Sequence, residues 1–447
     1  MPTSTDALIE ELSRFVTESP SSYHAAHAAA GRLVRAGFTQ LGEDQDWPTE
    51  PGRYVVVREG AIIAWVTPRH ASPTTGVRIL GAHTDSPGFK LKPRPSATAC
   101  GWEQAGVEVY GGPLLNSWLD RELRLAGRLI TRDGATHLVS TGPVARIPQL
   151  AIHLDRQVNE GLTLGKQAHT MPVLGLTGAA TGQDHVLELL AQAAGVQSEE
   201  IDGYDIVVAD AQSPARFGSG AVAEAGSGEF LASARLDNLS SVYAGLDALI
   251  TAADEAETGH VIPLLAAFDH EEIGSATRTG AAGPFLEEVL GRIYEGLGRR
   301  AGQEHGATAG QRAQAYAASW HISADAGHAV HPNYPERHDP GNRPLPNHGP
   351  LLKINANQRY TTDAAGSAMW RQVCRAASVP TQEFVANNNI PCGSTIGPLT
   401  ATRLGIRTVD VGIPLLSMHS AREMCGVEDM THLRNAVVAF YTADLQQ

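Results

Sequence analysis

The chain is poor in cysteine, and the few cysteines present are far apart. Only four occur among 447 residues, namely Cys100, Cys374, Cys392 and Cys425, and no two of them form a Cys-x-x-Cys pair. This spacing argues against a zinc knuckle and against a disulfide framework. We therefore expect reduced thiols, most of them buried.

Long apolar runs and basic clusters are also missing. No stretch approaches the roughly 20 apolar residues that span a bilayer, and residues 1–19 are too polar and acidic for a signal peptide. A formal net charge of −14 without a basic cluster argues against a nucleic-acid partner. We expect a cytoplasmic protein with neither a membrane nor a nucleic-acid partner.

The composition that remains is that of a globular protein, with 42% hydrophobic and 18% charged residues. A chain of 447 residues exceeds what one hydrophobic core usually supports. Two domains are therefore the default expectation.

Helical and strand patterns alternate in the two outer parts of the sequence. The periodicity predicts helices at 6–18, 22–35, 238–253, 284–298, 362–377, 395–404 and 431–445, and strands at 53–57, 61–66, 77–82, 261–268, 320–323, 383–386 and 407–411. Such alternation predicts an α/β layer fold.

The sequence between these parts has a different pattern, with frequent turn residues and short apolar pieces. Turn residues punctuate it at Pro93, Pro95, Gly101 and the pair Gly111-Gly112. Short strand-like pieces follow at 127–131 and 137–140, and the first long helical pattern is at 184–194. We predict a discontinuous α/β domain, residues 1–92 and 234–447, interrupted by a β-rich insert at 93–233.

Two adjacent glutamates, Glu271 and Glu272, follow the apolar run 261–268. Such a pair is ordinarily a set of solvated charges at a loop entrance, because charged residues are mostly exposed. Side chains alternate between the two faces of a strand. Neighbouring carboxylates at a strand end can therefore serve one site in two ways, one holding a metal and one handling a proton.

Five polar clusters lie at the ends of apolar runs in the α/β segments. They are His83-Thr84-Asp85, Leu236-Asp237-Asn238, Asp269-His270-Glu271-Glu272, the segment from Ser323 to His328, and Ser417-Met418-His419-Ser420. Sites in open α/β sheets form beyond the carboxyl ends of strands, so these clusters can converge. Mixed histidine and carboxylate ligands suit zinc, and aminopeptidases hold two metal ions roughly 3.5 to 4 Å apart.

Each of these residues also has an ordinary interpretation. His83 would bond the backbone at a strand end, Asp237 would cap a helix, Asp325 would cap a turn, and His419 would be a loop histidine. Together, in strand-end context, they favour a metal site.

Several strings resemble the aspartyl aminopeptidase family, peptidase family M18. They are GAHTDSPGFKLKP at 81–93, RLDNLSS at 235–241, FDHEEIGS at 268–275, SADAGHAVHPNYPERH at 323–338, LKINANQRYTTD at 352–363, SMHSAREM at 417–424 and, inside the insert, AIHLDRQVNEG at 151–161. The resemblance implies a two-segment α/β/α sandwich metallopeptidase domain with an inserted oligomerisation domain. It further implies a homo-oligomer, a tetrahedral dodecamer built from dimers.

The resemblance also implies two Zn²⁺ ions and their ligands. His83 and Asp325 would bind one ion. Glu272 and His419 would bind the second, and Asp237 would bridge the two. Co²⁺ or Mn²⁺ accept overlapping ligands, so the sequence leaves the native metal open.

The remaining catalytic roles follow from the same resemblance. Glu271 would be the general base, since a carboxylate not used as a ligand can accept a proton. Asp85 would orient His83 through its second ring nitrogen, as metal-binding histidines commonly require. We expect Asp85 on the same strand face as His83, two residues along.

Residues that meet substrate are also implied by the resemblance. The ammonium group of Lys353 would pair with the side chain of an N-terminal Asp or Glu, and His328 and Tyr360 would contact substrate or intermediate. His153, in the insert, would reach the active site of a neighbouring subunit. Its ordinary interpretation is a histidine buried in the core of the insert.

The predicted activity is hydrolysis of the N-terminal peptide bond of peptides, with a preference for Asp or Glu. One alternative is a broad or neutral-residue enzyme of the leucine type, and another is a dinuclear hydrolase acting on a different amide, such as an acylamino acid. An alternative of another class is a self-assembling scaffold or cargo protein without catalysis. A scaffold has no need of clustered carboxylates.

Overall fold

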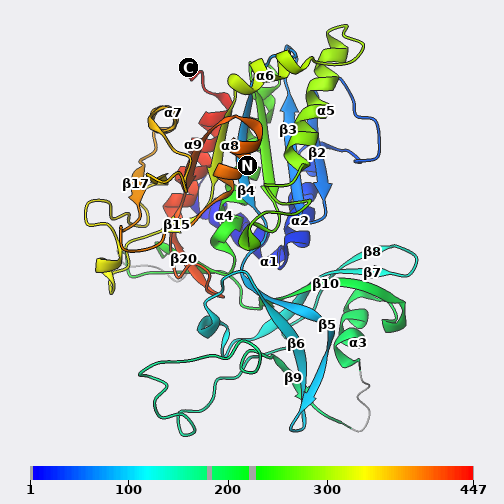
Figure 1. Ribbon diagram of the computed structural model, residues 1–447, viewed down its shortest axis with the longest axis vertical. Helices are drawn as coiled ribbons and strands as arrows, with labels where there is room; N and C mark the ends of the chain where they lie inside the picture. Colours follow the sequence, from blue (N-terminus) through cyan, green and yellow to red (C-terminus); the bar gives the residue numbers. More distant parts are fainter. Residues whose placement is uncertain (1–3, 179–183, 221–227, 446–447) are drawn as a thin grey trace.

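The computed structural model describes residues 4–178, 184–220 and 228–445. Figure 1 shows two parts, a large layered part and a second part built around a separate twisted sheet. Within the described residues, no helix is long and apolar enough to cross a membrane.

A nine-stranded mixed sheet forms the centre of the larger part. Its strands, in spatial order, are β1 (Thr39–Gln40), β2 (Gly52–Arg58), β3 (Ala61–Thr67), β13 (Ile262–Phe268), β4 (Val77–His83), β14 (Trp320–Ala324), β18 (Arg407–Gly412), β16 (Leu351–Ile354) and β17 (Gln382–Val385). Strands β13, β4, β14 and β18 are parallel neighbours. Their carboxyl ends therefore meet at one edge.

Helices cover both faces of this sheet. One face packs against α1 (Thr5–Glu18), α2 (Ser22–Arg35), α4 (Leu236–Ala256), α7 (Ala364–Ala377) and α9 (Val427–Thr442). The other packs against α5 (Phe285–Arg300), α6 (Ala309–Ala317) and α8 (Ile396–Leu404).

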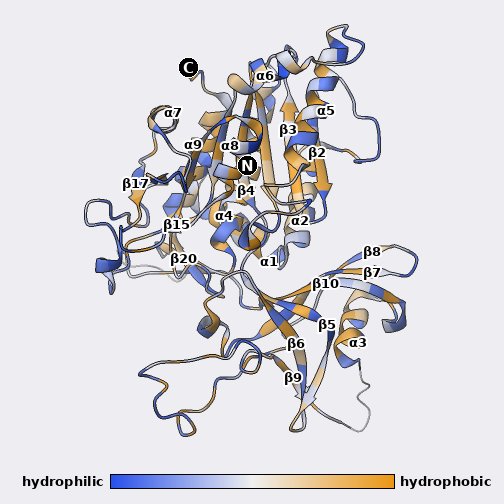
Figure 2. Cartoon of the chain, in the orientation of Figure 1, coloured by the Kyte–Doolittle hydropathy of each residue, from blue (hydrophilic) through white to orange (hydrophobic). Residues whose placement is uncertain are grey.

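Alternate strand residues point to the two helical layers. Leu80 and Leu265 join the core under the first set of helices, whereas Ile79 and Leu264 join the core under the second. Figure 2 shows the apolar character of the central strands. Strands buried on both faces read as continuous apolar runs, and the predicted three-layer α/β/α arrangement is confirmed.

The second part is an antiparallel six-stranded sheet with one helix. Its strands, in spatial order, are β8 (Thr136–Ser140), β7 (Leu123–Thr131), β10 (Ile201–Asp210), β5 (Gly88–Ala99), β6 (Trp102–Tyr110) and β9 (Val173–Leu176), and its helix is α3 (His185–Ala194). Phe89, Leu125 and Leu190 belong to its own hydrophobic core. The expectation of a β-rich module is confirmed.

Prolines do not end strand β5, contrary to the expectation of turns at Pro93 and Pro95. The pairing of β5 with β6 stops at Leu91 and resumes at Ser96. Both prolines lie in this irregular stretch, where a missing backbone N–H costs no ladder hydrogen bond. The predicted boundary between residues 92 and 93 falls within this strand.

A third, five-stranded sheet joins distant segments. It contains β11 (Ala215–Phe217), β12 (Phe230–Ser233), β20 (Glu423–Gly426), β19 (Pro414–Leu416) and β15 (Gly327–His328). Short 3-10 turns complete the described chain: η1 (Leu115–Trp118), η2 (Ser198–Glu200), η3 (Glu271–Ile273) and η4 (Pro335–Arg337). The pairing of β12 with β20 ties the chain leaving the insert to the C-terminal segment.

Candidate metal centre

The carboxyl edge of the nine-stranded sheet carries most of the predicted site. His83 is the last residue of β4, and Glu271 and Glu272 follow β13. Asp325 directly follows β14, and His419 follows β19. Because the parallel strands end at the same edge, segments far apart in sequence meet there.

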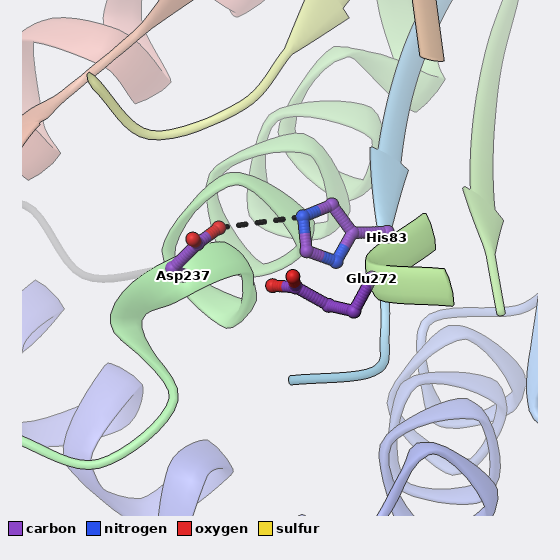
Figure 3. A group of neighbouring side chains, drawn as sticks. All are labelled: His83, Asp237 and Glu272. Atoms are coloured by element: carbon purple, nitrogen blue, oxygen red, sulfur yellow. Dashed lines mark ion pairs between the residues drawn. The ribbon is translucent and has the colours of Figure 1, made fainter. Parts of the chain in front are cut away.

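Asp237 enters this group from the start of α4 and lies between the two histidines. Its Oδ1 is 3.3 Å from Nε2 of His83, and its Oδ2 is 3.4 Å from Nε2 of His419. Figure 3 shows the carboxylates of Asp237 and Glu272 facing the ring of His83. One carboxylate thus touches both histidines, one with each oxygen.

Each histidine has a second carboxylate neighbour. Oδ1 of Asp325 is 3.5 Å from Nε2 of His83, and Oε2 of Glu272 is 3.5 Å from Nε2 of His419. The five side chains therefore form two histidine–carboxylate pairs that share Asp237. The family resemblance implies the same grouping of these five residues.

The donor set fits zinc. Two ligands of one tetrahedral Zn²⁺, each at about 2.0–2.1 Å, are separated by roughly 3.4 Å, which matches the four nitrogen–oxygen distances. Ligand atoms of His83, Asp237 and Glu272 all lie within 4.8 Å of one another. Oδ1 of Asp237 and Oε1 of Glu272 are buried without a hydrogen-bond partner among the described residues. A cation at this place would satisfy both.

Electrostatics also favour a cation here. Burial, together with the charge of Asp237, raises the pKa of Glu272 well above its usual range. Burial raises the pKa of Glu271 to about 7. Crowded carboxylates with low exposure cost free energy unless a positive charge compensates them, and a bound divalent ion would be the largest local charge.

Asp85 contacts His83 as expected, but from a different backbone position. Strand β4 ends at His83, so the prediction that Asp85 lies on the same strand face was wrong, and Asp85 lies in the loop that follows the strand. Nδ1 of His83 is 3.4 Å from Oδ1 of Asp85 and 3.1 Å from its backbone oxygen. Burial alone would raise the pKa of Asp85, but its hydrogen bond with His83 and the charge of that ring, followed by Tyr110, lower it.

The glutamate pair also differs from the expected strand end. Glu271 and Glu272 begin the 3-10 turn η3, and His270 before them has a left-handed φ of 64°. Their backbone N–H groups donate to Oδ1 and Oδ2 of Asp85, at 3.0 and 3.1 Å. A turn anchored on Asp85, rather than strand alternation, separates the two carboxylates.

The predicted substrate residues lie beside Asp325. Nζ of Lys353 is buried, donates to the backbone oxygen of Ala326 at 2.7 Å and lies 3.5 Å from Oδ2 of Asp325. It is also 5.3 Å from the ring centre of Tyr360. His328 is exposed. The site therefore brings Lys353 and Tyr360 together, with the ammonium group already engaged by Asp325.

His153 lies in the loop of residues 141–172 between β8 and β9, which extends away from the nine-stranded sheet in Figure 1. It is exposed. The ordinary interpretation, a histidine buried in the core of the insert, was wrong.

Two residues near the centre were missed by sequence reasoning. The buried carboxylate of Glu423 accepts hydrogen bonds from the backbone N–H of Asp237 at 2.9 Å and of His419 at 2.8 Å. Tyr110 donates to Oδ2 of Asp85 at 2.8 Å. A carboxylate opening the short apolar run Glu423–Val427 was a usable signal for the first, whereas nothing local marked the second.

Known proteins resemble this chain over nearly its whole length. Residues 15–441 match the family described as "Aminopeptidase I zinc metalloprotease (M18)". A relative from Streptomyces avermitilis, named "Probable M18 family aminopeptidase 2", is 50% identical over 433 residues, covering 96% of each chain.

Solved structures of M18 aminopeptidases resemble this chain as well. An M18 family aminopeptidase from Thermotoga maritima superposes with a TM-score of 0.84 at 25% identity, covering 98% of this chain and 96% of that one. The mApe1 dodecamer of S. cerevisiae gives 0.83 at 29% identity, covering 98% and 97%. The chain therefore belongs to the M18 family of zinc metallo-aminopeptidases, hydrolases that act on N-terminal peptide bonds.

Proposed function

We propose that this enzyme is a dinuclear zinc aminopeptidase that removes N-terminal Asp or Glu from peptides. The observation that carries the proposal is the position of Asp237, with one oxygen 3.3 Å from His83 and the other 3.4 Å from His419. A carboxylate between two histidines, each with its own second carboxylate, is suited to bridge two ions.

The ligands divide into two sets around this bridge. His83 and Asp325 would hold one zinc ion, and Glu272 and His419 the other. When bound, the two ions would polarise the scissile carbonyl, acidify a water molecule and stabilise developing negative charge.

Glu271 has the properties of the general base. Its carboxylate is not needed as a ligand in this arrangement, and burial raises its pKa above that of an exposed glutamate, which makes it a better proton acceptor. General bases work best with a pKa near the working pH. We assign Glu271 to accept a proton from the attacking water and to return it to the nitrogen of the departing amine.

A preference for acidic residues rests on Lys353. An ammonium has three donors, and the contacts with Ala326 and Asp325 account for two of them. The third is available for a substrate carboxylate beside Tyr360. A neutral preference would follow if Lys353 served only to hold Asp325, so the leucine-type activity is retained as the second candidate.

The insert is assigned an assembly role. The exposed loop carries His153 between Ile152 and Leu154, which are 49% and 74% exposed. We propose that residues 93–233 form the oligomerisation domain, that His153 reaches a neighbouring active site, and that the assembly is a tetrahedral dodecamer. The dodecameric relative supports this proposal.

Metal analysis combined with a substrate profile tests the function. We expect about two zinc ions per chain after dialysis, and faster hydrolysis of peptides that begin with Asp or Glu than of matched peptides that begin with Leu. Faster cleavage of the Leu peptides would favour the neutral alternative. A zinc-loaded protein that cleaves neither set would favour the scaffold alternative.

A further inference from the structure

The insert touches the metal centre through the short segment that leaves strand β6. Tyr110 is the last residue of β6, and its hydroxyl donates to Oδ2 of Asp85 at 2.8 Å. Asp85 in turn lies against Nδ1 of His83. A side chain of the six-stranded sheet is therefore two contacts away from a metal ligand of the nine-stranded sheet.

The same segment holds the other histidine. The backbone oxygen of Gly112 accepts a hydrogen bond from Nδ1 of His419 at 3.0 Å. The backbone N–H of Leu114 donates to the backbone oxygen of His419 at 2.9 Å. The first contact places the proton of His419 on Nδ1, which leaves Nε2 free to bind a metal.

Gly111, between these residues, packs directly on Glu272. It has a left-handed φ of 66°, and a β-carbon there would lie only 3.2 Å from both Cβ and the backbone oxygen of Glu272. On either side of Gly111 along the chain, Tyr110 bonds Asp85 and Gly112 bonds His419. Residues 110–114 thus contact Asp85, Glu272 and His419 together.

Contacts of this kind control metal affinity. Groups that hydrogen-bond to metal-binding histidines fix the tautomer and the ring orientation, and losing one commonly weakens metal binding by 10- to 100-fold. Burial, followed by the charge of Asp85, raises the pKa of Tyr110 above its usual range. The hydroxyl therefore keeps its proton and remains a donor to Asp85.

We propose that residues 110–114 of the insert are part of the metal centre, with Tyr110 as a positioning residue that holds Asp85 and, through it, His83. The proposal rests on the dinuclear zinc site described above. Because the segment also belongs to the insert, zinc binding and docking of the insert on the nine-stranded sheet are thermodynamically coupled. Each stabilises the other by the same free energy.

Tyr110→Phe tests the role by removing one oxygen atom. Tyr204→Phe is the matched control, because the hydroxyl of Tyr204 lies in the same six-stranded sheet and donates to the backbone oxygen of Lys92 at 2.6 Å, away from the metal ligands. Zinc-free wild type and both variants are titrated with Zn²⁺ against a competing chelator. Thermal unfolding of the zinc-free proteins is measured in parallel.

For Tyr110→Phe we expect about tenfold weaker binding of at least one zinc ion, the lower end of the range for groups that bond a metal-binding histidine directly, because Tyr110 acts through Asp85, while Tyr204→Phe binds like wild type. Wild-type affinity for both ions in Tyr110→Phe would overturn the positioning role, as would a loss confined to zinc-free stability. The zinc titration of the wild type tests the proposed dinuclear site separately from the role of Tyr110. A wild type that fails to bind about two ions would remove the dinuclear site, and the inference with it.

Discussion

The metal centre and the loop of residues 141–172 depart from the usual distribution of side chains in opposite directions. At the metal centre the carboxylate side chains of Asp85, Asp237 and Glu272 are only 4%, 4% and 6% exposed. In the loop, Leu150 and Leu154 are 56% and 74% exposed. One region buries charge, and the other exposes apolar surface.

Both departures identify regions that need something from outside the single chain. Buried carboxylates are costly unless a cation or donors compensate them. Clustered exposed apolar residues mark a surface that binds a protein or a membrane. Under the proposed function, the first region binds metal ions and the second binds another copy of the chain.

Glu271→Gln should have the largest effect on activity, and this effect should be confined to the metal centre. The substitution keeps the shape of the side chain but removes the proton acceptor, so we expect turnover to fall by about 10³-fold or more. Zinc content and oligomeric state should remain those of wild type, because in the proposed assignment Glu271 is not a metal ligand and it lies outside the loop. Steady-state kinetics, metal analysis and light scattering measure the three quantities.

Two other results would contradict the roles assigned to the two glutamates. If Glu271→Gln kept near-normal activity, Glu271 would not be the base. If it lost zinc instead, Glu271 would be a ligand.

Much of the candidate metal centre was predictable because the proposed ligands follow strong local patterns. The apolar runs behind His83 and the glutamate pair predicted strands that end at residues 82 and 268, and the structure ends β4 and β13 at His83 and Phe268. Parallel strands place such ends at one edge. The sequence therefore predicted which segments meet, and the structure brings them together; that these residues bind metal stays a prediction.

The outer contacts of the centre were not predictable, because they depend on tertiary packing. Tyr110 ends a strand of the six-stranded sheet, whereas its partner Asp85 follows a strand of the nine-stranded sheet, and Glu423 binds the backbone N–H of Asp237, 186 positions away. Periodicity reports which face of an element is buried, not which polar group it meets. The turn η3 was missed for the same reason, since Asp85 anchors it from another segment.

His153→Ala tests whether the two regions meet across subunits. If the imidazole stabilises the intermediate in a neighbouring site, turnover should fall by about 10²-fold, the usual effect of losing one such group. Zinc content should not change, because His153 contacts none of the ligands in its own chain. Activity equal to wild type would separate the loop from the chemistry.

A mixing experiment sharpens this prediction. A His153→Ala subunit retains Glu271, and a Glu271→Gln subunit retains His153, so a mixed oligomer contains some complete sites. With random assembly from equal amounts, half of the sites have Glu271 and half of those have a neighbour with His153, which gives about a quarter of wild-type activity. No recovery after dissociation and reassembly would show that each chain completes its own site.

Leu154→Asp changes the loop without touching the metal centre, and its effect on activity should be the smallest of the three. A carboxylate in an apolar contact is costly to bury, so the oligomer should dissociate on dilution, and activity should fall in proportion to the dissociated fraction, by no more than the loss expected for His153→Ala. Val34→Asp is the matched control, since Val34 is 45% exposed on α2, outside the insert.

An unchanged oligomer with Leu154→Asp would mean that the exposed loop is not the contact between subunits. Only the metal centre would then need a partner from outside the chain. If the oligomer dissociates but zinc affinity stays at the wild-type value, the loop governs assembly, and the contact of residues 110–114 with the metal centre does not depend on it.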